Sequence, residues 1–256
     1  MSRLMKYGYL AMGYVFLYLP ILVLMVFSFN SSKYAIGWKS FSLRWYVELF
    51  ADIRILTAAR NSLMLAFLAA TGATLLGTLA ALASSRYRYK GRKLIQTVVL
   101  IVILSPDIVM GVALLVMFVA ARLEPGFLTL LLAHITFCLP FVAVTVASRM
   151  HGFDRHVVEA AQDLGAGEFE TFRYVILPLI IPAVMAGWLL SFTLSLDDVI
   201  ISFFVTGPGF EILPLRIYSM VKLGVKPEVN ALCAILLTVT VFLVLASQLL
   251  LKERNR

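Results

Sequence analysis

Three features of the amino-acid sequence predict an all-α, polytopic membrane protein whose single transmembrane domain occupies residues 1–256. Hydrophobic residues make up 61% of the chain, and the mean hydropathy is +0.95. Charged residues make up only 14%, whereas a soluble domain carries about a quarter. The apolar residues form runs long enough, at about 1.5 Å per residue, to cross a hydrocarbon core about 30 Å thick. We predict six transmembrane helices, over residues 7–29, 61–84, 94–121, 127–148, 179–205 and 230–251.

The basic residues predict how these helices are oriented. The net charge is +8, but the basic residues lie in loops between apolar runs, which indicates membrane topology rather than nucleic-acid binding. Cytoplasmic loops are enriched in Lys and Arg. We therefore expect the 85–93 loop and, with six spans, both termini to be cytoplasmic. The basic residues of that loop are Arg86, Arg88, Lys90, Arg92 and Lys93.

The second predicted span carries small residues along one face. Steps of three and four residues place them on one stripe of a helix. Small residues let helices approach closely in lipid, so we expect this stripe to pack against another helix. Its members are Ala66, Ala70, Ala73, Gly77, Ala81 and Ser84.

The hydrophilic loop at 149–178 has the pattern of a helix, a glycine turn and a second helix. Asp154 can cap the first helix, and Gly165 permits the left-handed conformation that ends one. Pro178 lacks a backbone N–H and is expected to mark the boundary with the fifth span. A rigid elbow of this shape can transmit a push to the membrane helices. The spacing alone is also compatible with an ordinary solvated connector.

The sequence does not indicate an enzyme. It contains no G-x-x-x-x-G-K-[ST] phosphate-binding loop, so no nucleotide site is expected on this chain. No Ser-His-Asp set in a credible order and no HExxH motif occurs, so we assign no catalytic residues. His134 and Cys138 lie one turn apart, but a metal site needs more ligands than one imidazole and one thiol. We expect no metal, and we expect His134 to form a hydrogen-bonding contact between helices.

Three carboxylates lie within predicted spans: Asp107, Asp197 and Asp198. An acidic residue at the centre of a membrane helix costs about 2.5–3.5 kcal/mol, so such residues usually face a cavity or a partner. In a continuous fifth helix, Ser191, Ser195, Asp198 and Ser202 would share one face. These residues predict a path for a cationic solute. Pairing with a basic residue on another helix, a cap on a broken helix at Asp107, and a proton relay remain alternatives.

Two aromatic residues precede the second span. Trp45 and Tyr46 lie in the predicted outer loop, where aromatic rings can bind ammonium groups by cation–π contact, worth about 0.5–2 kcal/mol. They are candidates for the substrate path. An anchor at the membrane interface is the alternative interpretation.

Several segments indicate a family. The run Glu159-Ala160-Ala161, followed by Gly165 and then Leu177-Pro178, resembles the EAA loop by which binding-protein-dependent ABC importer permeases dock onto their ATPase. The resemblance makes Glu159, Ala160, Ala161 and Gly165 the docking elbow, which Leu177 and Pro178 close. From about residue 10 to 250 the chain resembles, more narrowly, the C-type permease subunits of bacterial spermidine/putrescine importers. The segments that narrow it include Ser105–Val109, Ser195–Asp198 and Leu213–Lys222.

This resemblance implies a type I ABC importer permease fold in the bacterial inner membrane. It also implies a heterodimer with a second, related permease, and a cytoplasmic ATPase dimer that holds the ATP and magnesium. A periplasmic or lipid-anchored polyamine-binding protein would complete the assembly. The implied function is polyamine import by alternating access. A permease for another cationic solute, a cation-coupled secondary transporter and a structural membrane subunit are the alternatives.

Overall fold

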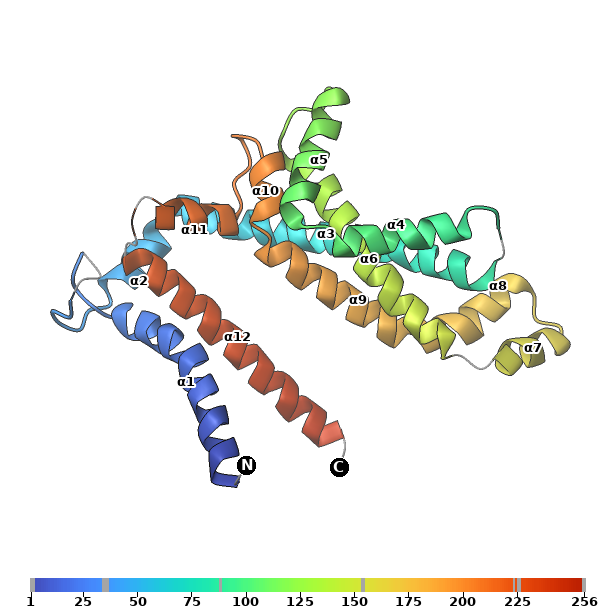
Figure 1. Ribbon diagram of the computed structural model, residues 1–256, viewed down its shortest axis with the longest axis horizontal. Helices are drawn as coiled ribbons and strands as arrows, with labels where there is room; N and C mark the ends of the chain where they lie inside the picture. Colours follow the sequence, from blue (N-terminus) through green and yellow to red (C-terminus); the bar gives the residue numbers. More distant parts are fainter. Residues whose placement is uncertain are drawn as a thin grey trace. The chain divides into compact units, whose positions relative to one another are not determined.

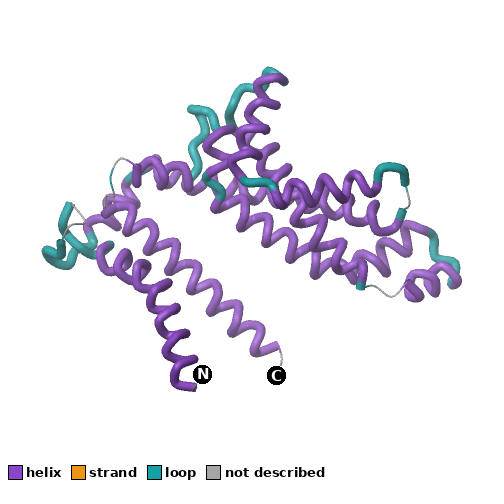
Figure 2. Tube along the Cα trace, in the orientation of Figure 1, coloured by secondary structure: helices purple, strands orange, loops and turns teal. Residues whose placement is uncertain are grey.

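The computed structural model describes residues 3–33, 37–87, 89–152, 155–222, 224 and 227–254. Helices dominate these ranges, and the only extended pairing within them is an antiparallel bridge between Asn30 and Phe41 (Figure 2). The all-α prediction is therefore confirmed. Arg88 of the basic loop and Asp154, the predicted cap, lie outside the described residues.

The chain divides into two compact units, residues 1–56 with 216–256, and residues 57–215. The first unit contains α1 (Arg3–Phe27), α2 (Arg44–Ala51), α12 (Pro227–Arg254) and most of α11 (Leu213–Lys222). Within it, α12 packs against both α1 and α2 (Figure 1). Most apolar side chains of α1 are exposed, as expected for a helix that meets lipid.

The second unit holds the remaining helices. In chain order they are α3 (Ile53–Arg86, from residue 57), α4 (Arg92–Leu104), α5 (Asp107–Ala120), α6 (Phe127–His151), α7 (Arg155–Asp163), α8 (Glu168–Thr171), the π-helical turn η1 (Phe172–Ile176), α9 (Leu177–Asp197) and α10 (Ile200–Val205). The α6 and α9 helices lie side by side (Figure 1). Val142, Val146 and Ile180 are fully buried in the apolar cluster that joins these two helices.

The small-residue stripe of α3 packs as predicted. A Cβ added at Gly77 would lie 2.8 Å from Val142 Cβ and 2.9 Å from the carbonyl oxygen of Leu139. The stripe residues Ala66, Ala70, Ala73 and Ala81 are buried. The close approach of α3 to α6 therefore depends on side chains no larger than methyl groups.

Two of the predicted spans are not continuous helices. The predicted span 94–121 is broken at Ser105-Pro106 into α4 and α5, which are bent by 116°. A residue before proline disfavours the helical conformation, and Ser105 is extended, with φ −73° and ψ 135°. The predicted span 179–205 ends at Asp197, and α10 begins only at Ile200.

The predicted count of six spans is not confirmed. Among the described residues, four helices are long and apolar enough to cross a membrane, or five if the bent pair forms one span. Pro227–Phe242 is a shorter apolar helix. The four long helices are Met5–Phe27, Ile53–Arg86, Phe127–Met150 and Glu168–Asp197.

Candidate functional site

The break between α9 and α10 is held by the side chain of Asp198. Asp198 leaves the helical conformation, with φ −64° and ψ 127°. Its Oδ1 accepts a hydrogen bond from the backbone N–H of Ile201 at 3.2 Å, and its Oδ2 accepts one from the N–H of Ser202 at 2.8 Å. An aspartate in this position satisfies N–H groups that have no partner within the helix. Asp198 thus starts α10.

His134 of α6 joins both sides of this break. Its Nδ1 lies 2.7 Å from Ser195 Oγ, and its Nε2 lies 2.9 Å from Ser202 Oγ. The Ser202 hydroxyl donates its one hydrogen to Asp198 Oδ2 at 2.8 Å. Nε2 of His134 is therefore the donor toward Ser202, an assignment that follows from the network. A fully buried polar chain thus links α6, α9 and α10.

This network changes the interpretation of the polar face that was predicted for a continuous fifth helix. Ser195, Asp198 and Ser202 point into the packed interior of the second unit, where the exposed fraction of Asp198 is only 8%. Ser191 is also buried, and its hydroxyl has no hydrogen-bond partner among the described residues. The predicted polar face of one continuous helix does not exist, because the helix ends at Asp197.

Asp197 and Asp107 are the two acids that remain accessible. Asp107 begins α5 directly after Pro106, as in the broken-helix alternative. The α5 and α10 helices pack closely, since a Cβ on Gly111 would lie 2.7 Å from the ring of Phe204 and 3.3 Å from the Cα of Ile201. Asp107 and Asp198 both act electrostatically on Asp197. The three carboxylates thus lie at helix breaks, Asp107 at the start of α5 and Asp197 and Asp198 between α9 and α10, and two of them are open.

Trp45 and Tyr46 are held by neighbours in the first unit. Trp45 is 3% exposed, and its Nε1 donates to the backbone oxygen of Asn30 at 2.6 Å. The hydroxyl of Tyr46 lies 2.7 Å from Ser28 Oγ, and its ring packs on Phe29. The ring of Trp45 therefore has little free face for an ammonium group, and its contacts are those of a residue packed inside the first unit.

The predicted elbow has the expected local geometry. Gly165 ends α7 with φ +88°, which a glycine adopts without a steric penalty. Its N–H donates to Gln162 O at 2.9 Å, and the N–H of Ala166 donates to Ala161 O at 3.1 Å, the pair of bonds that defines a Schellman C-cap. Glu159 and Ala160 are exposed, and Ala161 is half-buried.

An apolar tip accompanies the elbow. The side chain of Leu164, directly before Gly165, is 90% exposed, and Phe169 of α8 is also exposed. Val158 packs against the apolar cluster between α6 and α9. The elbow is thus anchored on one side and presents apolar and acidic groups on the other, which fits a docking surface better than a solvated connector.

Pro178 lies in the first turn of α9, at the boundary with the fifth span where the sequence predicts it, but no loop separates α9 from the preceding helical turns. The chain continues as one helical segment from Glu168 to Asp197, 30 residues long. A π-helical turn at Phe172–Ile176 directly precedes the proline, and in it the N–H of Leu177 donates to Phe172 O. Leu177 is half-buried and Pro178 exposed. Two non-helical residues, Ala166 and Gly167, therefore join the elbow to a helical segment that reaches Asp197 without a loop.

No metal site is evident in the described part of the chain, where no three His, Cys, Asp or Glu side chains gather into a ligand set. His134 and Cys138 are both buried. The Cys138 thiol lies 3.5 Å from the carbonyl oxygen of Ser191. Both residues therefore serve contacts between α6 and its neighbouring helices.

Comparisons with known proteins agree with this geometry. A family described as "Binding-protein-dependent transport system inner membrane component" matches residues 73–256. The chain is 52% identical over 255 residues to the spermidine/putrescine transport system permease protein PotC of Escherichia coli (strain K12), covering 100% of this chain and 97% of the relative. It is 44% identical over 235 residues to the putrescine transport system permease protein PotI of the same strain, covering 89% and 84%. Among solved structures, a bacterial ABC transporter involved in the import of the acidic polysaccharide alginate matches with a TM-score of 0.76 and 15% identity, covering 98% of both chains.

Proposed function

This chain belongs to the family of binding-protein-dependent transport system inner membrane components, and we propose that it is the permease subunit of an ATP-driven importer of spermidine and putrescine. The single observation that carries this proposal is the 52% identity to a spermidine/putrescine permease over the full length of the chain. Identity of this extent covers the elbow as well as both broken helices.

The proposed assembly contains three kinds of partner. A second, homologous permease forms a heterodimer with this chain, and a cytoplasmic ATPase dimer supplies the hydrolysis of ATP. A periplasmic or lipid-anchored binding protein delivers the polyamine to the outer loops. The chain lies in the bacterial inner membrane with both termini in the cytoplasm, an orientation supported by the basic residues of the 85–93 loop.

The elbow couples the ATPase to the membrane helices. Glu159, Ala160 and Gly165 dock on the ATPase, with Leu164 as an apolar contact. The ATPase dimer closes when it binds ATP, and this closure displaces α7. Because the segment from Glu168 to Asp197 is a single helical element, the displacement reaches the end of α9. Alternation between outward- and inward-open states then follows from a shift between two populations.

The open carboxylates supply the substrate chemistry. A polyamine carries two or more ammonium groups on an apolar chain, and Asp107 and Asp197 offer accessible negative charges beside the apolar surfaces of α5 and α9. An anionic solute would instead require basic side chains or free helix N-termini. Here a carboxylate occupies the first turn of α5, and the carboxylate of Asp198 caps the start of α10.

Uptake of labelled spermidine and putrescine tests this function. The complete operon is expressed in cells that lack their own polyamine importers, with and without this subunit. Uptake that requires the subunit and the ATPase, and that persists when ionophores collapse the ion gradients, is the expected result. Loss of uptake with ionophores but not with an inactive ATPase would identify a cation-coupled transporter. Uptake of other cations only would identify a different substrate.

A further inference from the structure

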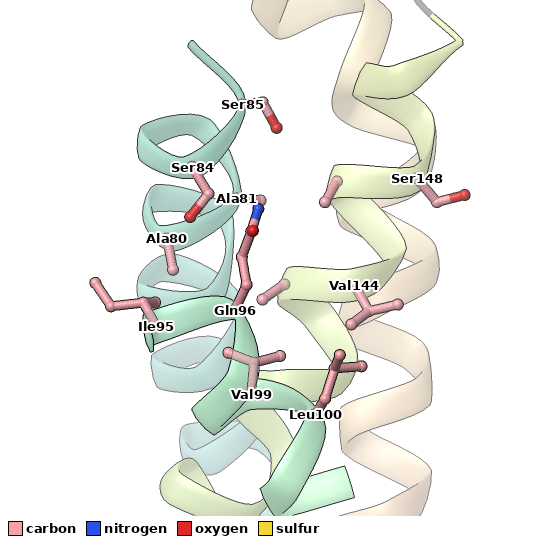
Figure 3. Close-up of a pocket in the computed structure, with 12 residues that line it drawn as sticks. Ala80, Ala81, Ser84, Ser85, Ile95, Gln96, Val99, Leu100, Val144 and Ser148 are labelled. Atoms are coloured by element: carbon pink, nitrogen blue, oxygen red, sulfur yellow. The ribbon is translucent and has the colours of Figure 1, made fainter. Parts of the chain in front are cut away.

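The second unit contains a pocket whose lining includes none of the residues proposed for the substrate path. It lies between α3, α4 and α6 and has a volume of about 370 Å³ (Figure 3). This volume is within the range of about 300–1,000 Å³ that is typical of ligand pockets. Most of the wall is apolar, including Ala80, Ile95, Val99, Leu100 and Val144.

One end of the pocket is polar. Ser85, Gln96 and Ser148 line it there, and Figure 3 shows Gln96 extending from α4 toward the serines of α3. The hydroxyl oxygen of Ser85 is buried and has no hydrogen-bond partner in the structure. This oxygen has almost no exposed surface, so the hydrogen-bonding group of this end that an occupant can reach is the amide of the exposed Gln96.

The polar end lies beside basic side chains. Arg86 follows Ser85 at the end of α3, while Arg92 and Lys93 precede Gln96 by four and three residues and share its side of α4. None of these three cations forms an ion pair with another described residue. The three cations are not part of the pocket lining, but they follow or precede lining residues by one to four positions, so the pocket combines an apolar wall with a hydrogen-bonding end that has basic residues close by in the chain.

We infer that this pocket binds an anionic phospholipid. One acyl chain occupies the apolar part, the Gln96 amide donates to an ester or phosphate oxygen, and the phosphate lies near Arg92 and Lys93. Basic pockets between membrane helices on the cytoplasmic side have this specificity. An apolar helix of a partner subunit would fill the apolar part but leave the Gln96 amide and the cations unmatched.

Photo-crosslinking in the complete transporter tests this inference independently of transport. A photoreactive residue replaces Ile95, and the complex is placed in bilayers that contain radiolabelled phosphatidylglycerol or phosphatidylcholine with identical acyl chains. We expect several-fold more labelling by phosphatidylglycerol. The same photoreactive residue in place of Leu79, an exposed α3 residue outside the pocket, should be labelled equally by the two lipids.

Charge variants complete the test. Arg92→Gln combined with Lys93→Gln should abolish the preference for phosphatidylglycerol at position 95, while Lys6→Gln, an exposed lysine on α1, should preserve it. Neither change touches the apolar core, and the yield of assembled complex confirms that each variant folds. Equal labelling by the two lipids, or a crosslink from position 95 to the second permease instead of lipid, would overturn the inference.

Discussion

The imidazole of His134 lies 2.7 Å from the hydroxyl of Ser195, a contact between residues 61 positions apart in the chain. Through its other nitrogen, the same ring reaches Ser202 beyond the helix break. A hydrogen-bonded chain in a buried site has a single favourable arrangement, because every unmatched member costs desolvation energy. His134 therefore fixes where α9 ends and, with it, the direction in which Asp197 points.

Loss of the His134 ring should destabilise the protein. His134→Ala leaves the buried Ser195 hydroxyl without its partner, at a cost of about 1–3 kcal/mol, while Ser202 keeps its bond to Asp198 Oδ2. The unfolding midpoint of the purified complex should fall by several degrees, and His134→Gln should recover part of the loss. Thr136→Ala is the control, since the exposed Thr136 hydroxyl bonds only to its own helix at Leu132. An unchanged midpoint in His134→Ala would contradict this role.

The two adjacent aspartates should behave differently. Asp197→Asn removes an exposed negative charge and should lower polyamine uptake severalfold at unchanged membrane levels. Asp198→Asn weakens the cap of α10 and its bond to Ser202, at a cost of about 0.5–2 kcal/mol, and should lower the amount of folded subunit. Uptake measured per assembled complex separates the two effects. Normal uptake by Asp197→Asn would exclude this residue from the substrate path.

The elbow should tolerate a side chain at one glycine and not at another. Gly165→Val forces a β-branched residue to φ +88°, which costs roughly 1–2 kcal/mol or more. It should distort the turn, so that less ATPase co-purifies and uptake falls. Gly167→Ala is a matched control, because its φ is −67° and an added Cβ meets no atom closer than 3.9 Å. Equal behaviour of the two variants would argue against a role for the turn geometry.

The charge of the elbow can be tested separately. Glu159 is exposed, so Glu159→Lys should leave the fold of the subunit intact while it weakens docking on the ATPase and uncouples transport. The amount of co-purified ATPase and the rate of uptake are the two measurements. Full co-purification together with normal uptake would show that this carboxylate is not part of the docking surface.

The contact between α3 and α6 should not accept a larger residue. At Gly77, an added Cβ would lie 2.8 Å from Val142 Cβ and 2.9 Å from a backbone oxygen, and overpacking of this kind costs about 1–3 kcal/mol. Gly77→Val should therefore lower the unfolding midpoint. Gly13→Val on α1 places its side chain in open space and should change the midpoint much less. A similar decrease for both would mean that helix propensity, rather than packing, limits stability.

Much of this protein follows from its sequence by itself. Long apolar runs predict membrane helices because the bilayer requires about 20 apolar residues to span it. The packing face of α3 and the turn at Gly165 also follow from the sequence. Helix periodicity predicts the first and backbone sterics predict the second, and both are local properties of the chain. The elbow motif also indicated the family without any coordinates.

The tertiary structure determined the environment of each side chain, which a local sequence pattern does not contain. Asp197 and Asp198 are neighbours with the same side chain, yet one is exposed and the other is buried against His134 and Ser202. The helix break separates their environments. It depends on contacts of His134 in α6 with Ser195 and Ser202 of α9 and α10, which are 61 and 68 residues away in the chain. Likewise, α9 begins at the predicted boundary beside Pro178, but packing of Ile176 and Ile180 in the core keeps the chain helical across that boundary through a π turn. Buried contacts outweigh local propensity at these positions because they carry the larger free energy.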